Sequence, residues 1–357
     1  MAHKIEKNDR VYLARLPELF DGKGWHGLGI PTESFVKENL NGIFFPFEFR
    51  PAFVKGLNDE LIQTGERYAV ALDNGEPIAG AVGRVFDTVD NEQLFDLFSE
   101  ALAGSRYKLC SAMTLGNRKS FCVDAKADEV IKAAGRDILP YVGLSRGFGG
   151  SEPLRISVHS TVIQCANTQA LFNREADVAT DSVRSKNTAR LRERLPLIQA
   201  TIERSWGVQA EFAKALESAQ SHKVKPEQAR LGFVGFLGVE NLGKTARTAN
   251  RVNRLVQLFK SGAGNKGEDG SDFVNAITDY YTHESAGSVD SSDSPADFLN
   301  KQWASSEFGS ASRVKSELIN TLLPGGKFAE KEFKAMVSRG RKAIENSDKE
   351  VVALLEA

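Results

Sequence analysis

The first half of the chain alternates apolar and polar residues over short runs broken by turn residues, a pattern typical of β-strands. Asp73-Asn74-Gly75-Glu76 predicts a hairpin turn, and residues 116–119 predict a second one. Within this region, apolar residues three or four positions apart predict a helix over Asn91–Ala103. The predicted strands are Tyr68–Leu72, Ile78–Val85, Leu109–Leu115, Ser120–Asp124 and Leu154–Cys165.

From about residue 186 onward the apolar period becomes helical. Asn187–Ala219 is long and amphipathic, interrupted only by Pro196 and Gly207. Thr245–Lys260 predicts a second helix with a clear apolar stripe, and the last sixty residues predict further helices. The expected fold is therefore α+β, with a twisted antiparallel sheet in the N-terminal half and a helical C-terminal half.

Charge is distributed unevenly along the 357 residues, although the formal net charge is only −1. Residues 181–260 carry 15 basic and 7 acidic side chains, whereas residues 261–300 carry 1 basic and 8 acidic. A near-neutral total therefore does not exclude a polyanionic partner. Four segments are expected: a strand-rich α+β region (1–180), a basic helical region (181–260), an acidic Gly/Ser-rich linker (261–300) and C-terminal helices (301–357).

Several functional classes find no support in the composition. With 41% hydrophobic and 26% charged residues, the chain is that of an ordinary globular protein. Its three cysteines are far apart and its five histidines show no i, i+4 pairing, so we expect neither a metal site nor a cofactor. The first residues lack a signal-peptide pattern and no apolar stretch is long enough for a membrane span, which predicts a cytoplasmic protein.

The basic region contains two groups of cationic residues. The first lies on the predicted helix 245–260, where spacings of three and four place its members on one face. The second precedes residue 195, with few carboxylates between its members. Both could neutralise a phosphate backbone, and an aromatic ring such as Trp25 or Phe148 could stack on bases. The two groups are Lys244, Arg247, Arg251 and Arg254, and Arg184, Lys186, Arg190, Arg192 and Arg194.

Residues 238–245 read GVENLGKT and match the phosphate-loop pattern G-x-x-x-x-G-K-[ST], with Gly238, Gly243, Lys244 and Thr245 at the fixed positions. The match follows the apolar run Leu231–Leu237 and precedes a helix, which is the context of a nucleotide-binding loop. The residues after 260, however, offer helices and linkers rather than the further parallel strands that such a domain needs. An NTP-binding enzyme is therefore an alternative prediction.

Short motifs are spread along nearly the whole chain. They are Met1-Ala2-His3, residues 25–29, residues 116–121, Gly149-Gly150-Ser151, residues 165–168, Asn187 with Arg190-Leu191, residues 275–280 with His283, and residues 308–310 with Arg313 and Lys315. In their order and spacing they resemble the motifs of a phage- and plasmid-like protein family catalogued as domain of unknown function 932. Two departures stand out: Arg184-Ser185 replaces the usual His-Ser/Thr pair, and the family has no phosphate loop at 238–245.

The resemblance implies a product of phages or mobile elements whose gene often lies near genes of DNA metabolism. A strand-rich half followed by basic helices is similar in outline to ring-forming single-strand annealing proteins, an analogy of fold alone. The predicted function is therefore a non-enzymatic, homo-oligomeric protein of the bacterial host cytoplasm that binds single-stranded DNA and promotes annealing or recombination. A phage structural or host-interaction protein is the third alternative.

Overall fold

The structure is a computed structural model of the chain. The residues described are 10–14, 30–32, 36–78, 81–83, 89–115, 117–148, 154–162, 167–170, 192–193, 195–240, 242–243, 246–285, 305 and 310–356.

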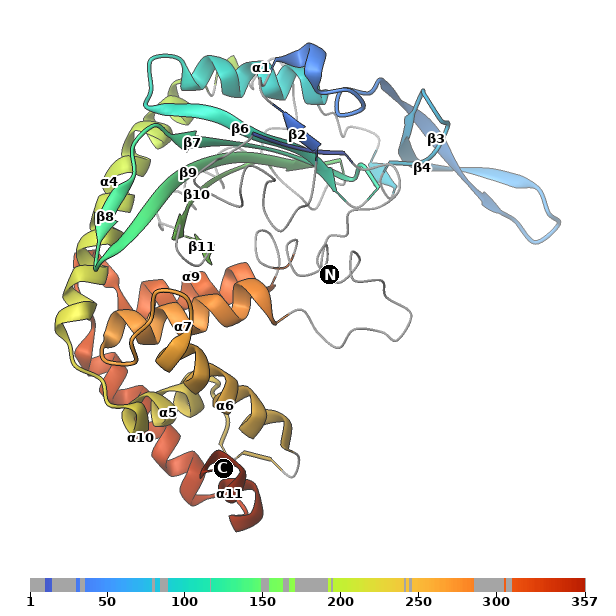
Figure 1. Cartoon of the computed structure of the whole chain (residues 1–357). Coiled ribbons are helices and arrows are strands. Elements are labelled where there is room, and N and C mark those ends of the chain that lie inside the picture. The colour runs from blue at the N-terminus through green and yellow to red at the C-terminus, as the bar shows by residue number, and fades with distance from the viewer. Residues whose placement is uncertain are drawn as a thin grey trace.

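A large sheet forms the N-terminal half and confirms the predicted fold class (Figure 1). In the described residues its strands follow the order β11-β10-β9-β7-β6-β1-β2, and β8 pairs with β9. Neighbours are antiparallel, except for the parallel pair β1 and β2. The strands are β1 (Val11–Ala14), β2 (Ile30–Thr32), β6 (Tyr107–Leu115), β7 (Ser120–Ala127), β8 (Ile131–Ala133), β9 (Arg136–Gly147), β10 (Arg155–Val162) and β11 (Asn167–Ala170).

A smaller sheet has the order β3-β4-β5, and its long hairpin projects away from the body (Figure 1). Its strands are β3 (Phe47–Lys55), β4 (Leu61–Ala71) and β5 (Val82–Gly83). The turn predicted at Asp73–Glu76 is confirmed, because Ala71 accepts from Gly75 N and donates to Glu76 O. The preceding strand is longer than predicted: Leu61–Arg67 pairs with β3 although its alternation is weak.

Helix α1 (Asn91–Leu102) covers one face of the large sheet and confirms the helix predicted there (Figure 1). Asp90 caps it by accepting a hydrogen bond from Gln93 N at 2.7 Å. Leu94 and Phe98 are fully buried in the core that α1 shares with the sheet. The short 3-10 helix η3 (Lys37–Asn39) precedes it, and Lys37 bonds two carboxylates of α1.

Helix α4 (Leu195–Ser221) connects the sheet to the helical half. Its Ser205 Oγ lies 2.7 Å from Tyr107 Oη of β6, and Gln209 Nε2 donates to the Tyr141 carbonyl of β9 at 3.2 Å. The predicted helix therefore exists, with Pro196 in its first turn and Gly207 at an exposed position. Residues 187–191, where the prediction began, lie outside the described part of the chain.

The C-terminal half is helical, as predicted, and α7 lies near its centre (Figure 1). The Phe273 ring of α7 stacks on Phe233 at 4.5 Å and meets Phe333 edge-on at 5.1 Å. No described helix is long and apolar enough to cross a membrane. The helices are α5 (Pro226–Phe236), α6 (Ala246–Ser261), α7 (Gly270–His283), α9 (Ser310–Leu322), η4 (Pro324–Gly326), α10 (Glu330–Glu345) and α11 (Lys349–Glu356).

The prediction of a linker over residues 261–300 was wrong for residues 270–283, which form α7. Phe273, Val274 and Ile277 are fully buried and give the segment an apolar core face. Its acidic residues are not a solvated run either, because Asp269 caps the helix N-terminus and Asp272 binds a buried arginine. The acidic residues of this segment thus form a helix cap and an internal ion pair rather than part of a linker.

Helices α5 and α10 approach each other closely at two glycines. A Cβ atom on Gly235 would lie 1.9 Å from the Met336 carbonyl oxygen, and one on Gly340 would lie 1.9 Å from the Leu231 carbonyl oxygen. Since the obstacles are backbone atoms, neither helix can yield by rotating a side chain. The crossing therefore requires glycine at both positions.

We expect Gly340→Ala to separate α5 from α10 and to lower the free energy of unfolding by about 3 kcal/mol. Thermal unfolding followed by circular dichroism measures the effect as a fall of the midpoint by roughly 5 °C or more. Gly207→Ala is the matched control, because a Cβ there meets no atom within 4 Å. It should leave the midpoint unchanged or raise it slightly. Equal midpoints for the two variants would contradict the close crossing.

Candidate functional site

Helix α6 presents the arginine face that the sequence predicts. Ala249, Val252, Val256 and Phe259 are buried on one side, as the apolar stripe indicated. Two of the predicted arginines, Arg247 and Arg254, are exposed, and the third, Arg251, is half-buried. The helix contains no carboxylate between Ala246 and Ser261. Lys244 belongs to the same predicted group but lies outside the described residues.

Part of this arginine face is covered by the C-terminal end of α7. Arg254 Nε donates to both carboxylate oxygens of Glu284, at 2.9 and 2.7 Å, and Arg254 Nη2 donates to Oε1 at 2.5 Å. These hydrogen bonds raise the pKa of Arg254. The Arg251 guanidinium lies 6.0 Å from the centre of the Tyr280 ring. One residue of the acidic segment therefore neutralises one residue of the basic face.

The second predicted basic group cannot be placed beside the first. Arg184, Lys186, Arg190 and Arg194 lie outside the described residues, and so does Trp25. Arg192 is described and is exposed just before α4. The structure therefore brings Arg247, Arg251 and Arg254 together and leaves the position of the other group as a prediction.

Phe148 does not present a ring to solvent. It is fully buried, with its ring centre 5.8 Å from that of Phe45 and 5.0 Å from that of Phe47. The Arg146 guanidinium lies over it at 4.1 Å, and burial lowers the pKa of Arg146 to about 9. The ring thus belongs to a small apolar core beneath the hairpin, and no face is open for stacking on a base.

The phosphate-loop match lies in a different structural context from the one predicted. The apolar run Leu231–Leu237 is not a strand, because its residues 231–236 form the C-terminal part of α5. Gly238 and Gly243 adopt positive φ angles of 66° and 76°, and Leu242 N between them donates to Ser347 Oγ at 2.8 Å. A nucleotide-binding loop joins a strand to a helix, whereas this segment follows a helix. Lys244 and Thr245 lie outside the described residues.

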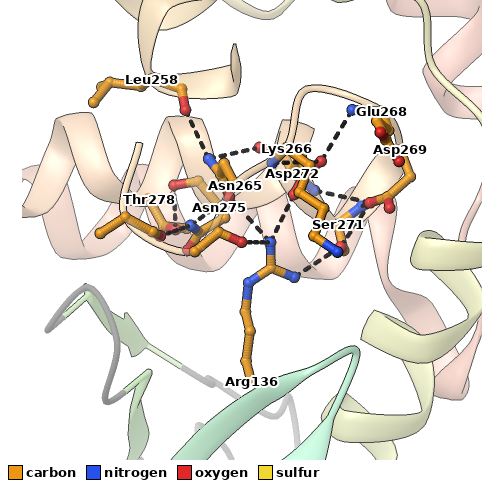
Figure 2. Close-up of polar contacts among 12 residues, drawn as sticks. Arg136, Leu258, Asn265, Lys266, Glu268, Asp269, Ser271, Asp272, Asn275 and Thr278 are labelled. Carbon is orange, nitrogen blue, oxygen red and sulfur yellow. Dashed lines mark hydrogen bonds and ion pairs between the residues drawn. The ribbon is translucent and has the colours of Figure 1, made fainter. Parts of the chain in front are cut away.

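A buried arginine from the sheet enters the helical half, as Figure 2 shows. Arg136, the first residue of β9, donates to Ser271 Oγ and Asp272 Oδ1 at 2.8 Å each. It also donates to Asn265 Oδ1 at 3.0 Å and to the Gly264 carbonyl at 3.2 Å. The second oxygen of Asp272 accepts from the backbone N–H groups of residues 266 and 268. The Arg136, Ser271 and Asp272 side chains at its centre are buried, so the cluster joins the two halves.

A second titratable cluster lies between the sheet and helices α7 and α9. Lys315 of α9 is fully buried and donates to Thr282 Oγ1 at 3.2 Å. Burial and the charge of Lys315 lower the pKa of His159, which stacks on Tyr141 at 5.1 Å, to about 3. Burial and the nearby Glu284 raise the pKa of Asp279 to about 7. Such shifts often occur at functional sites.

Sequence reasoning missed this second cluster. His283 Nε2 lies 3.8 Å from Asp279 Oδ1, an i, i+4 pair of a histidine and a carboxylate that the printed sequence already contains. The spacing of Asp279 and His283 was the available signal, since residues four apart lie on the same face of a helix. Among the described residues, no group of three or more His, Cys, Asp or Glu side chains is placed to hold a metal ion.

A row of polar residues also crosses the large sheet and was missed. Ser111, Asp124, Gly143 and Ser157 are neighbours on β6, β7, β9 and β10. Ser111 Oγ donates to Asp124 Oδ2 at 2.7 Å. A Cβ on Gly143 would lie 2.2 Å from Asp124 Oδ1 and 2.6 Å from Ser157 Oγ. The Asp124 and Ser157 side chains therefore occupy the space that a side chain at position 143 would need. Alternate polar positions along the predicted strands were the available signal.

Comparison with known proteins agrees with the motif resemblance. The sequence profile of the family described as Domain of unknown function (DUF932) matches residues 79–315. The chain belongs to the DUF932 family. The DUF932 match extends from before α1 to Lys315, so it includes the large sheet from β6 onward, α4 to α7, and the buried lysine. No curated protein and no solved structure matches the chain.

The raised pKa of Asp279 makes a pH-dependent prediction. The folded protein holds this proton more tightly than the unfolded chain, so its stabilising contribution is full below about pH 4 and is lost as the pH rises through 7. The free energy of unfolding of Asp279→Asn, measured relative to wild type, should therefore rise by roughly 2–4 kcal/mol between pH 4 and pH 8.

Urea unfolding at several pH values measures this difference. The control is Glu332→Gln, which alters an exposed carboxylate of α10. Its free energy of unfolding should differ from that of wild type by a constant amount. A constant difference for Asp279→Asn as well would show that the Asp279 carboxyl titrates alike in the folded and unfolded chain.

Proposed function

We propose that this DUF932 protein binds single-stranded DNA and promotes strand annealing or recombination, without catalysing a reaction, in the cytoplasm of a bacterial host. The observation that carries the proposal is the arginine face of α6: Arg247, Arg251 and Arg254 share one side of a helix that contains no carboxylate. Guanidinium groups bind phosphate through several donors at once, so such a face suits a nucleic-acid backbone.

The spacing of the three arginines suits an extended strand. Arg247 and Arg254 are two helical turns apart, which is about 10 Å along the axis. A strand that lies along α6 would meet successive cations and would release counterions from successive phosphates. Because none of these contacts depends on base identity, binding should tolerate any sequence and weaken steeply with salt.

The main alternative, an NTP-binding enzyme that uses Gly238–Thr245, receives less support from the structure. The segment before Gly238 is helical, so it does not supply the strand from which a phosphate loop emerges. Loss of ATP binding in Lys244→Ala, with DNA binding intact, would favour that enzyme over our proposal. A structural or host-interaction protein would bind no DNA at all.

The first test removes charge from the proposed interface. We expect Arg247→Ala/Arg251→Ala to weaken binding to a fluorescent single-stranded oligonucleotide about tenfold at low salt. The slope of log K against log salt should fall in magnitude by about 1.4, since each lost phosphate contact contributes about 0.7. Fluorescence anisotropy at several salt concentrations measures both quantities.

The matched control removes two exposed cations from α10. Lys331→Ala/Lys342→Ala lowers the net charge by the same amount and should change affinity by less than twofold. Equal losses in the two variants would mean that net charge alone governs binding. No binding by the wild-type protein at low salt would overturn the proposal.

The second test uses the ion pair between Arg254 and Glu284. Glu284→Gln should release Arg254 for phosphate and tighten binding about two- to fivefold at low salt. In an Arg254→Gln background the same change should have no effect, because the cation that Glu284 neutralises is gone. Anisotropy titrations of the four proteins complete the cycle, and an equal gain in both backgrounds would indicate a general effect of charge.

A further inference from the structure

The hairpin of β3 and β4 forms an arm that extends beyond the body of the molecule (Figure 1). The register between the two strands shifts between Pro51 and Phe53, and β5 pairs with β4 only at Glu66 and Arg67. The outer part of the arm, residues 53–63, is therefore a two-stranded ribbon in the described structure. Such a ribbon is marginally stable in water unless it packs against something else.

Apolar side chains occupy both faces of this outer ribbon. Val54 lies opposite Ile62 on one face, whereas Phe53 and Leu61 lie on the other, because alternate residues of a strand point to opposite sides. Leu57 at the tip is fully exposed, and the other four are 48–71% exposed. A hairpin that packs one face on its own protein shows polar residues on the outer face. This arm shows exposed apolar residues on both, so the described part of its own chain covers neither face.

The charges of the ribbon do not favour nucleic acid as its partner. Residues 53–63 carry one basic and two acidic side chains. The basic residue, Lys55, is 2.7 Å from Asp59, so no unpaired cation is left for a phosphate. A surface that is apolar and nearly neutral is compatible with an identical surface on a second copy of the chain.

We propose that the arm is a self-association element, in which the tips of two copies pack against each other. Because the apolar side chains lie on both faces, a contact through one face uses two of them together with Leu57, roughly 350 Å² on each arm. Two such surfaces bury about 700 Å² together, which corresponds to a weak, transient interface.

Pro51 further indicates the mode of contact. It lies on β3, the edge strand of the small sheet, and lacks an N–H group with which to bond another strand. Proline on an edge strand hinders continuous strand addition. The contact is therefore formed by apolar side chains of the two tips rather than by strand addition at Pro51. This inference is independent of DNA binding.

Sedimentation velocity of the full chain without DNA, from 1 to 100 μM, tests the proposal. Wild type should show a concentration-dependent dimer, and Leu57→Ser/Leu61→Ser/Ile62→Thr should shift the midpoint of association at least tenfold upward. The matched control, Val130→Ser/Leu354→Ser, removes two exposed apolar side chains outside the arm and should associate like wild type. Equal melting temperatures would show that the variants are folded.

A chemical cross-link identifies the contact itself. Leu57→Cys places a thiol at the tip, and a short bismaleimide should join two copies in this variant. The same thiol with Leu61→Ser/Ile62→Thr should cross-link at least tenfold less. A monomeric wild type at 100 μM, or association that the tip substitutions leave unchanged, would overturn the proposal. So would arm-dependent binding to phosphatidylcholine vesicles without self-association, which would identify a lipid surface as the occupant.

Discussion

The buried guanidinium of Arg136 links the large sheet to the helical half in the described structure. Arg136 leaves the sheet at the start of β9 and ends among the side chains and carbonyls at the N-terminus of α7. Removing a charge from water costs several kcal/mol, and the partners recover this only with good geometry. Asp272 supplies the opposite charge, and the caps and turns around it satisfy the carboxylate. This pairing helps to hold the N-terminus of α7 against the start of β9.

The elements with strong periodicity were predictable from the sequence. Helix α1 and the apolar side of α6 each show one clear period. The Asp73–Glu76 turn was also predictable, whereas of the described residues in the strand predicted over 78–85 only Val82–Gly83 form one. Helix α7 was missed because its carboxylates resembled a solvated segment, and no single-sequence pattern reveals that Asp272 binds an arginine 136 positions away. The run before Gly238 was ambiguous for a different reason, since five apolar residues and two glycines in seven positions suit a buried helix as well as a strand.

In the candidate sites, too, local features could be predicted from the sequence, whereas long-range contacts could not. The arginine face of α6 depends only on local spacing, and its geometry could be predicted. Its partial neutralisation by Glu284 could not, because the two residues come together through the packing of α6 on α7. Phe148 was proposed as a stacking ring on its type alone, and burial decides against it. The contrast between adjacent basic and acidic segments is therefore, in part, a set of ion pairs inside one folded unit.

The bond between Arg136 and Asp272 also has a consequence for how the chain folds during synthesis. Arg136 leaves the ribosome 136 residues before its partner carboxylate, which corresponds to roughly ten seconds of synthesis. Until then the end of β9 cannot be dehydrated without an uncompensated charge. In the nascent chain the start of β9 therefore stays hydrated until α7 has been synthesised and packs against it. Completion of the fold is thus timed by a long-range contact, which slows folding but makes the two halves cooperative.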